Sequence, residues 1–188
     1  MISPQTIQQL NDHFAIAGAV DFQSGEGGLP HAVLTGHGAT AHVYTLGGHV
    51  THYQPDGHEP VLWMSSHSTF EPGKPIRGGV PICLPWFAAR EDRPDLPMHG
   101  FARTTVWQVQ NTNQTQNGDV ILTLIMTDNQ QTRELWPFAF EFRMVVTVGE
   151  VLTVTLTVTN QSEQAMPISQ ALHSYFNVSD VRQIQVTG

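Results

Sequence analysis

Apolar residues and threonines alternate strictly in the stretch "VLTVTLTVTN", near the C-terminal end of the sequence. The even positions from Leu152 to Val158 are apolar, and the odd positions from Thr153 to Thr159 are threonine. Successive side chains of an extended chain point to opposite faces, so one face of this segment is apolar and the other polar. The pattern predicts a half-buried antiparallel strand.

Two preceding segments extend this pattern into a sheet. "FEFRMVVTV" (residues 140–148) alternates in the same way, and "VGE" between the two runs is typical of a short hairpin turn. "DVILTLIMTD" (residues 119–128) is a more fully apolar run, introduced by the turn signal "NGD". From Ala41 onward, many short strands with Gly and Pro between them predict an all-β, mainly antiparallel sandwich.

One short N-terminal helix is expected beside the strands. Ser3 is placed as its N-cap with Pro4 in the first turn, and Ile7, Leu10 and Phe14 fall on roughly one helical face.

The composition of the chain changes between Ser65 and Arg103, where six of the twelve prolines and five of the eight Lys and Arg residues lie. This composition predicts a long ordered loop region, and such loops in compact domains usually carry function. Because no repeat or linker interrupts the chain, residues 1–188 are expected to form a single domain.

Composition narrows the classes of function. A formal charge of −8, without a local Lys/Arg cluster, argues against nucleic acid as a partner. The single cysteine, Cys83, is expected to be a small core residue in "PICLPWF". The N-terminus lacks the pattern of a signal peptide, and no apolar run is long enough to span a bilayer. A cytoplasmic protein without a membrane partner is therefore expected.

The loop region contains two candidate binding motifs. Arg77 directly precedes Gly78 and Gly79, so its guanidinium could be presented to a ligand beside closely approaching backbone, or it could be a solvated arginine in a tight turn. In "LPMHGFAR", His99 and Arg103 lie close together and suit a hydroxyl-rich or anionic ligand.

The ten histidines raise the possibility of a metal site, especially His49, His52 and His58. His49 and His52 would face opposite sides of a strand, and no cluster of cysteines or carboxylates supports them, so no metal is expected. His173, in "ALHSYFNV", could be a core histidine, a metal ligand or one half of an acid/base pair.

Four motifs in order, "FEPGKPIRGGVPICLPWFA", "LPMHGFAR", "WPFAFEFRMVVTV" and "LTVTLTVTNQSEQAMPISQALHSYFNV", resemble the aldose 1-epimerase-related proteins, and more closely their D-hexose-6-phosphate mutarotase branch. The resemblance runs from about Leu46 to the C-terminus. It implies a galactose-mutarotase-like β-supersandwich and an isomerase that interconverts the α and β anomers of a sugar without a cofactor.

The resemblance also implies roles for individual residues. His173 corresponds to the general acid, Arg77 and Arg103 to the arginines that bind the sugar phosphate, and His99 to a histidine that contacts the sugar. Met98 stands where many relatives have glutamine, which leaves the exact sugar open. Lys74 is a third cation that could reach the phosphate.

The family's general base is a glutamate on a later strand, whereas Asp180 is the only carboxylate after His173 in this sequence. The chain therefore resembles the N-terminal two-thirds of the enzyme, incomplete at its C-terminus, and residues 1–188 alone are expected to be inactive. The alternatives are an aldose 1-epimerase for free sugars and a non-catalytic carbohydrate-binding β-sandwich.

Overall fold

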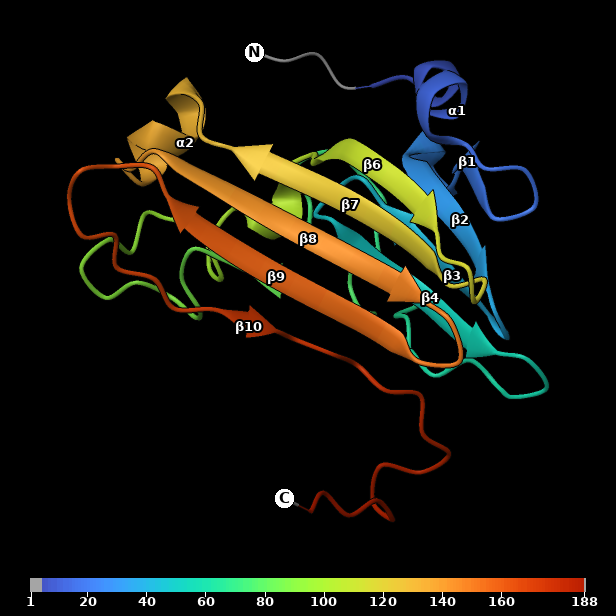
Figure 1. Cartoon of the computed structure of the whole chain (residues 1–188). Coiled ribbons are helices and arrows are strands. Elements are labelled where there is room, and N and C mark those ends of the chain that lie inside the picture. Colours follow the sequence, from blue (N-terminus) through green and yellow to red (C-terminus); the bar gives the residue numbers. More distant parts are fainter. Residues whose placement is uncertain (1–4, 188) are drawn as a thin grey trace.

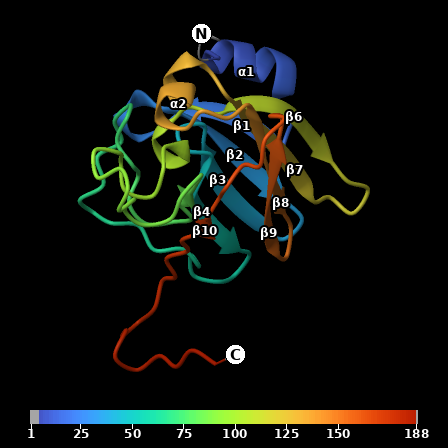
Figure 2. The same ribbon diagram turned by 90° about the vertical axis from the view of Figure 1, so that its left-hand side faces the viewer.

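Two four-stranded antiparallel sheets lie face to face in the computed structural model, which describes residues 5–187. Figure 1 shows β6 to β9 in front of the first sheet, and Figure 2 shows the two layers edge-on. The elements are, in order, α1 (Ile7–Phe14), β1 (Val20–Ser24), the 3-10 turn η1 (Glu26–Gly28), β2 (Pro30–Gly36), β3 (Ala39–Tyr44), β4 (His49–Pro55), β5 (Ile82–Cys83), the 3-10 turn η2 (Ala102–Thr104), β6 (Gln108–Gln114), β7 (Val120–Thr127), α2 (Gln130–Leu135), β8 (Phe140–Val148), β9 (Leu152–Asn160) and β10 (Ala171–Leu172).

The second sheet, in the order β6-β7-β8-β9, confirms the strands expected from alternation. Strand β8 alternates regularly between buried and partly buried residues, and β9 alternates between partly buried and exposed ones. No residue of β7 is exposed, in agreement with its more apolar sequence. Strand β9 stays half-exposed because it pairs only with β8 within the described residues.

The first sheet, in the order β1-β2-β3-β4, is a meander of neighbouring hairpins. Its regular register breaks once, where His42 pairs with His52 but Val43 pairs with Val50. The additional residue in β4 is a β-bulge, a feature that bends a strand locally.

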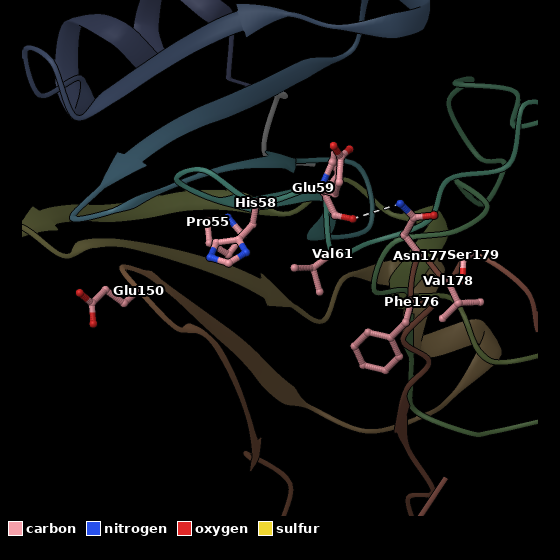
Figure 3. Close-up of a pocket in the computed structure, with 10 residues that line it drawn as sticks. Pro55, His58, Glu59, Val61, Glu150, Phe176, Asn177, Val178 and Ser179 are labelled. Carbon is pink, nitrogen blue, oxygen red and sulfur yellow. Dashed lines mark hydrogen bonds between the residues drawn. The ribbon is translucent and has the colours of Figure 1, made fainter. Parts of the chain in front are cut away.

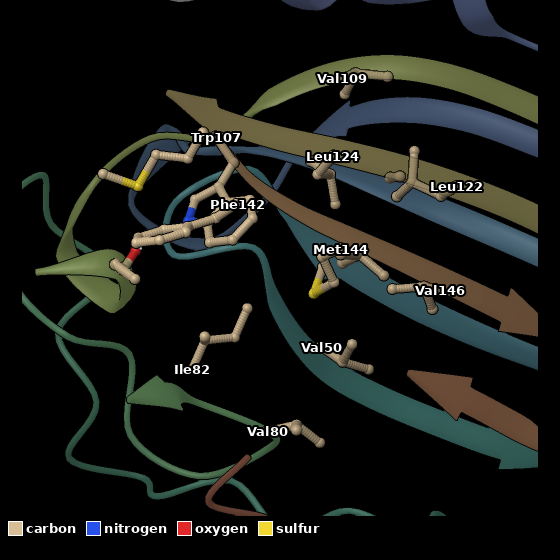
Figure 4. Close-up of a cluster of buried hydrophobic side chains, with 14 of the residues drawn as sticks. Val50, Val80, Ile82, Trp107, Val109, Leu122, Leu124, Phe142, Met144 and Val146 are labelled. Carbon is tan, nitrogen blue, oxygen red and sulfur yellow. The ribbon is translucent and has the colours of Figure 1, made fainter. Parts of the chain in front are cut away.

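The core fills the space between the sheets (Figure 4). Phe142, Met144 and Val146 of β8 are fully buried against residues of the facing sheet such as Val50. Burying a side chain of this size stabilises the folded state by about 1.5 to 3 kcal/mol. Cys83 is buried, as expected for a small core residue.

The N-terminal helix is present, but the cap assigned from the sequence is wrong. Ser3 and Pro4 lie outside the described residues, whereas α1 begins at Ile7 with Thr6 as its N-cap. Thr6 and Gln9 form a capping box, in which each side chain accepts a hydrogen bond from the other residue's backbone N–H. A second short helix, α2, was not expected; Asn129 caps it in the same way.

The segment from Ser65 to Arg103 is mostly irregular, as its composition predicted. Figure 2 shows these loops gathered on one side of the sandwich. They contain one short strand, β5, which pairs with β10 from far along the chain. The two α-helices of the described chain have 8 and 6 residues, and neither could cross a membrane.

Candidate active site

The segment from Arg77 to Cys83 connects the first sheet to the stretch that contains His173. On one side, the Val80 N–H donates to the carbonyl of Val50 in β4 (2.9 Å). On the other side, the His173 N–H donates to the Pro81 carbonyl (3.0 Å). The short β5–β10 pairing continues this ladder. The residues that follow Arg77 therefore lie beside the stretch around His173, although the two segments are distant in sequence.

Two glycines allow the chain after Arg77 to lie close to neighbouring backbone. Gly78 and Gly79 have φ angles of 101° and 61°, a region that favours glycine. A Cβ atom on Gly79 would lie 2.3 Å from the Val50 carbonyl oxygen, and one on Gly78 would lie 2.5 Å from the Trp63 carbonyl oxygen. Both clashes involve backbone atoms, so the chain after Arg77 requires glycine at these two positions.

Arg77 and Arg103 line one cavity of about 230 Å³. Trp63 and Tyr175 form part of its wall, and their rings lie 5.9 Å apart. The structure thus brings together the two arginines that the sequence analysis selected.

The pairing of the cationic side chains distinguishes this cavity from the rest of the surface. Six of the eight Lys and Arg residues form an ion pair with a neighbouring carboxylate: Lys74, Arg90, Arg93, Arg133, Arg143 and Arg182. Within residues 5–187, Arg77 and Arg103 have no such partner, and both line the same cavity. Lys74 pairs with Glu71 at 2.8 Å and is not part of the cavity lining, so its expected contribution is not supported.

Arg103 is partly buried and is held by the Met98 carbonyl, which accepts a hydrogen bond from its Nη2 (2.9 Å). Burial lowers the pKa of Arg103, and the nearby positive charge of Arg77 acts in the same direction. Two like charges in a partly buried cavity create a site that an anion would stabilise. The site is therefore electrostatically suited to a phosphate or carboxylate.

Two hydrogen bonds to the backbone of Ala88 hold His99. The ring Nδ1 of His99 accepts from the Ala88 N–H (3.0 Å), and the backbone N–H of His99 donates to the Ala88 carbonyl (2.9 Å). Burial lowers the pKa of His99, and the charges of Arg103 and His173 add to the effect. The neutral ring therefore carries its proton on Nε2, which makes His99 a hydrogen-bond donor.

His173 is exposed, which excludes the interpretation as a buried core histidine. Its ring stacks on that of Tyr175, with centroids 4.8 Å apart, and lies 6.4 Å from the ring of His99. Tyr175 also lines the arginine cavity, so His173 adjoins that cavity. Within the described chain, no carboxylate forms a hydrogen bond or ion pair with His173; Asp180 is paired with Arg182 at 2.9 Å.

Met98 has a more peripheral position. Its side chain is 55% exposed and contributes to a different cavity of about 440 Å³, which Arg103 also lines. Its carbonyl, rather than its side chain, contacts Arg103.

Another cavity, of about 820 Å³, lies elsewhere, between residues 55–61 and 176–179 (Figure 3). Its lining contains His58, Glu59 and Glu150 but no arginine or lysine. Asn177 bridges its two sides by donating to the Pro60 carbonyl (3.2 Å). This composition offers no cation for a phosphate.

Tyr175, Trp63 and the position of His49 were not predicted from the sequence. Tyr175 is two residues from His173, and this spacing in an extended segment could have placed both side chains on one face. His49, considered as a metal ligand, is instead fully buried, with its Nε2 2.7 Å from the Gly78 carbonyl. Among the described residues, no group of three or more His, Cys, Asp or Glu side chains is arranged to hold a metal ion.

Comparison with known proteins gives the same picture over most of the chain. The sequence profile of the family described as "Aldose 1-epimerase" matches residues 31–188. A Salmonella typhimurium protein named "Putative glucose-6-phosphate 1-epimerase" is 38% identical over 142 residues, which are 76% of this chain and 46% of that protein. A protein of the same name from Cenchrus ciliaris is 36% identical over 170 residues, covering 86% of this chain and 51% of that protein. The chain thus spans about half the length of these relatives.

Solved structures share the fold. The crystal structure of a "putative mutarotase (YeaD)" from Salmonella typhimurium matches with a TM-score of 0.80 and 32% identity, covering 89% of this chain and 54% of that chain. A galactose mutarotase-like protein from Clostridium acetobutylicum matches with a TM-score of 0.70 over 85% of this chain and 54% of that chain. At 18% identity, the second match indicates the fold alone. The expected galactose-mutarotase-like all-β fold is confirmed, and the profile match over residues 31–188 shows that this chain belongs to the aldose 1-epimerase family.

Proposed function

We propose that this chain forms the phosphate-binding and acid-bearing part of a hexose-6-phosphate mutarotase, an isomerase that interconverts the α and β anomers of a sugar such as glucose 6-phosphate. The observation that carries the proposal is the pair of arginines without carboxylate partners in the described chain, which line one cavity beside His173. Guanidinium groups suit phosphate because each can donate two parallel hydrogen bonds to its oxygens.

In the proposed reaction, protonated His173 donates its proton to the ring oxygen of the sugar as the bond from that oxygen to C1 breaks. A base removes the proton of the C1 hydroxyl, whose oxygen becomes the carbonyl oxygen of the open-chain aldehyde. Rotation about the C1–C2 bond presents the other carbonyl face, and ring closure reverses both proton transfers. A histidine suits this exchange because its reference pKa of about 6.5 lies near neutral pH.

The other residues have binding roles in this proposal. Arg77 and Arg103 hold the phosphate, and the Nε2–H of His99 donates to a sugar hydroxyl. In this proposal the sugar ring lies beside His173, which is exposed. No cofactor or metal takes part in the proposed steps.

The general base is not assigned to a described residue. Asp180 is neutralised by Arg182, and Glu71 by Lys74, so neither is free beside His173. Glu91 is exposed on the loop region, and its side chain forms no ion pair within residues 5–187. We therefore propose that residues 1–188 alone do not catalyse mutarotation, and that the base is a glutamate in the part of the relatives that this chain does not cover.

Polarimetry on fresh α-glucose 6-phosphate tests this proposal, with the spontaneous rate subtracted. We expect no catalysis by the 1–188 chain, and catalysis by a chimera that joins it to the unmatched C-terminal part of the Salmonella typhimurium relative. The chimera should act on the phosphorylated sugar in preference to galactose. A catalytic rate from the 1–188 chain alone would show that the base lies within it, and Asp180, Glu71 and Glu91 would be the first carboxylates to replace.

Two other functions are distinguished by the same assay. Equal activity of the chimera on free aldoses would assign it to aldose 1-epimerase chemistry without phosphate recognition. Sugar binding without turnover, even in a folded chimera, would favour a non-catalytic carbohydrate-binding sandwich; the lack of a carboxylate contact to His173 among residues 5–187 is the observation that keeps this alternative open.

A further inference from the structure

A buried histidine contacts the backbone directly after Arg77. His49, the first residue of β4, is 0% exposed, and its Nε2 lies 2.7 Å from the carbonyl oxygen of Gly78. Gly78 directly follows Arg77, whose side chain lines the proposed phosphate cavity. His49 itself does not line that cavity, so it would act only through the backbone that it contacts.

The chemistry of the contact fixes the state of the ring. A carbonyl oxygen only accepts, so Nε2 must carry the hydrogen and donate it. The other ring nitrogen, Nδ1, is buried without a hydrogen-bond partner among the described residues. Burial lowers the pKa of His49 to about 4, while the Gly78 bond opposes this and the charge of Arg103 reinforces it. His49 is therefore a neutral donor near neutral pH.

This bond pairs the carbonyl of the peptide group that joins Gly78 to Gly79. The N–H of that same peptide group, which belongs to Gly79, donates to the Trp63 carbonyl (2.8 Å), and the Arg77 carbonyl of the preceding peptide group accepts from the Ser65 N–H (3.1 Å). Between them, Gly78 has a φ of 101°, and glycine restricts its own backbone less than any other residue. Removing the imidazole donor would leave a buried carbonyl unpaired next to Arg77, a state that favours rearrangement of this peptide.

We infer that His49 is a positioning residue, which orients the Arg77 guanidinium toward the sugar phosphate by holding the Gly78 carbonyl. The inference rests on the proposed function and adds a residue that determines preference for a phosphorylated over an unphosphorylated sugar. Its effect passes through Arg77, whereas Arg103 is held separately by the Met98 carbonyl.

Two substitutions separate the hydrogen bond from the volume of the side chain. His49→Gln retains an amide donor with a reach similar to that of Nε2, and His49→Leu fills the space without a donor. Calorimetric titration of the 1–188 chain with glucose 6-phosphate and with glucose measures both affinities. We expect His49→Leu to weaken glucose 6-phosphate binding by about tenfold, the equivalent of one lost buried hydrogen bond, with less than a roughly twofold change for glucose. His49→Gln should recover most of the affinity.

Tyr53→Phe is the matched control. Tyr53 lies on the same strand, is 5% exposed, and donates to the carbonyls of Gly149 (3.1 Å) and Glu150 (2.8 Å) at the far end of the sandwich. It should lower the melting temperature without changing the ratio of the two affinities. In an Arg77→Met background, His49→Leu should cause no further loss of phosphate preference, because the residue through which it acts is absent.

The outcomes are separable. If the unmodified chain binds both sugars equally, the proposed function fails and this inference fails with it. If it prefers glucose 6-phosphate but His49→Leu keeps the same preference, or loses both affinities in parallel as Tyr53→Phe would through destabilisation, the inference is overturned and the proposed function stands. Should His49→Leu not fold, His49→Asn replaces it, since its shorter amide does not reach Gly78; an unchanged preference in that variant also overturns the inference.

Discussion

The interior between the sheets and the arginine cavity are built on different principles. In the interior, side chains such as Phe142 and Met144 alternate along regular strands and are fully buried. In and beside the cavity, Arg77, His99 and His173 are partly or fully exposed and stand on irregular backbone. Main-chain hydrogen bonds between distant segments, rather than side-chain packing, hold them together. The sandwich therefore supplies stability, and in the proposed function the loops supply the chemistry.

The same contrast appears in the charges. Away from the cavity, the cations of the described chain are neutralised by nearby carboxylates, and such exposed pairs contribute little to stability. Arg77 and Arg103 lack these partners in residues 5–187 and also repel each other. This repulsion lowers the stability of the free protein, and binding of an anion would offset the loss. The proposed binding site is therefore distinguished by two arginines that lack a carboxylate partner in the described chain.

The largest expected effect concerns the exposed acid. Replacing His173 with Asn in the catalytic chimera should lower turnover by about 10²- to 10⁴-fold, the usual contribution of a positioned proton donor. The melting temperature should stay the same because His173 packs little. Polarimetry and thermal unfolding measure the two quantities. A near-normal rate would remove His173 from the mechanism.

A core substitution should show the opposite behaviour. Phe142→Ala is expected to lower the free energy of unfolding by about 3 to 5 kcal/mol, because it removes a fully buried ring and leaves a cavity. Arg77→Met should change the same quantity by less than about 0.5 kcal/mol. Urea unfolding of both variants makes this comparison. Similar losses would mean that the site loops contribute to stability as the core does.

Lowering the pH should reduce the stability of the folded protein through His49, the buried histidine that contacts Gly78. The pKa of His49 is lowered from 6.5 to about 4 in the folded protein, so the unfolded chain binds the extra proton first as the pH falls. Stability should therefore decline between pH 6.5 and about 4, by roughly 3 kcal/mol from this residue. His31, His42, His52 and His99 also have lowered pKa values and steepen the decline.

The contribution of His49 to the pH dependence of stability is obtained by comparing the unmodified chain with a variant that lacks the imidazole. Urea unfolding at several pH values, with His49→Gln beside the unmodified chain, should show a shallower decline in the variant. Parallel curves would indicate that His49 titrates normally or that the unfolded chain also keeps it neutral.

The smallest expected effect is that of salt. Raising the ionic strength should weaken binding of glucose 6-phosphate several-fold and leave binding of glucose nearly constant, since screening acts on the exposed part of the arginine–phosphate attraction. The stability of the core should hardly change over the same range. Titrations at low and high salt test this, and an equal response of both sugars would speak against charge recognition.

The sandwich was largely predictable because strand formation follows a short-range pattern. The alternation in residues 140–148 and 152–160 identified β8, β9 and the turn between them. The six-residue helix α2 was missed because its signal, a capping box at Asn129 and Thr132, precedes no long apolar face. The true cap of α1, Thr6, was missed in favour of Ser3, since both are good capping residues.

The site was predictable only in part. The glycines after Arg77 indicated a close backbone approach, and the clash of either Cβ with a carbonyl confirms it. The Lys74–Glu71 pair is local, since the two residues are three positions apart. The contact of His49 with Gly78 instead joins residues that are distant in sequence, and no local pattern specifies such a partner. The roles assigned to Met98, His99, Arg77, Arg103 and His173 remain proposals.

One set of titrations tests whether Arg77 and Arg103, which have no carboxylate partner in residues 5–187, form a phosphate site. Affinities for glucose 6-phosphate and glucose are measured for the 1–188 chain, for Arg77→Met/Arg103→Met and for Arg143→Met, the last replacing an arginine that is already paired with Glu141. We expect the unmodified chain and Arg143→Met to prefer the phosphorylated sugar, and the double variant to lose at least about tenfold in affinity for it alone. Equal affinities of the unmodified chain for both sugars, or a double variant that keeps the preference, would contradict this expectation.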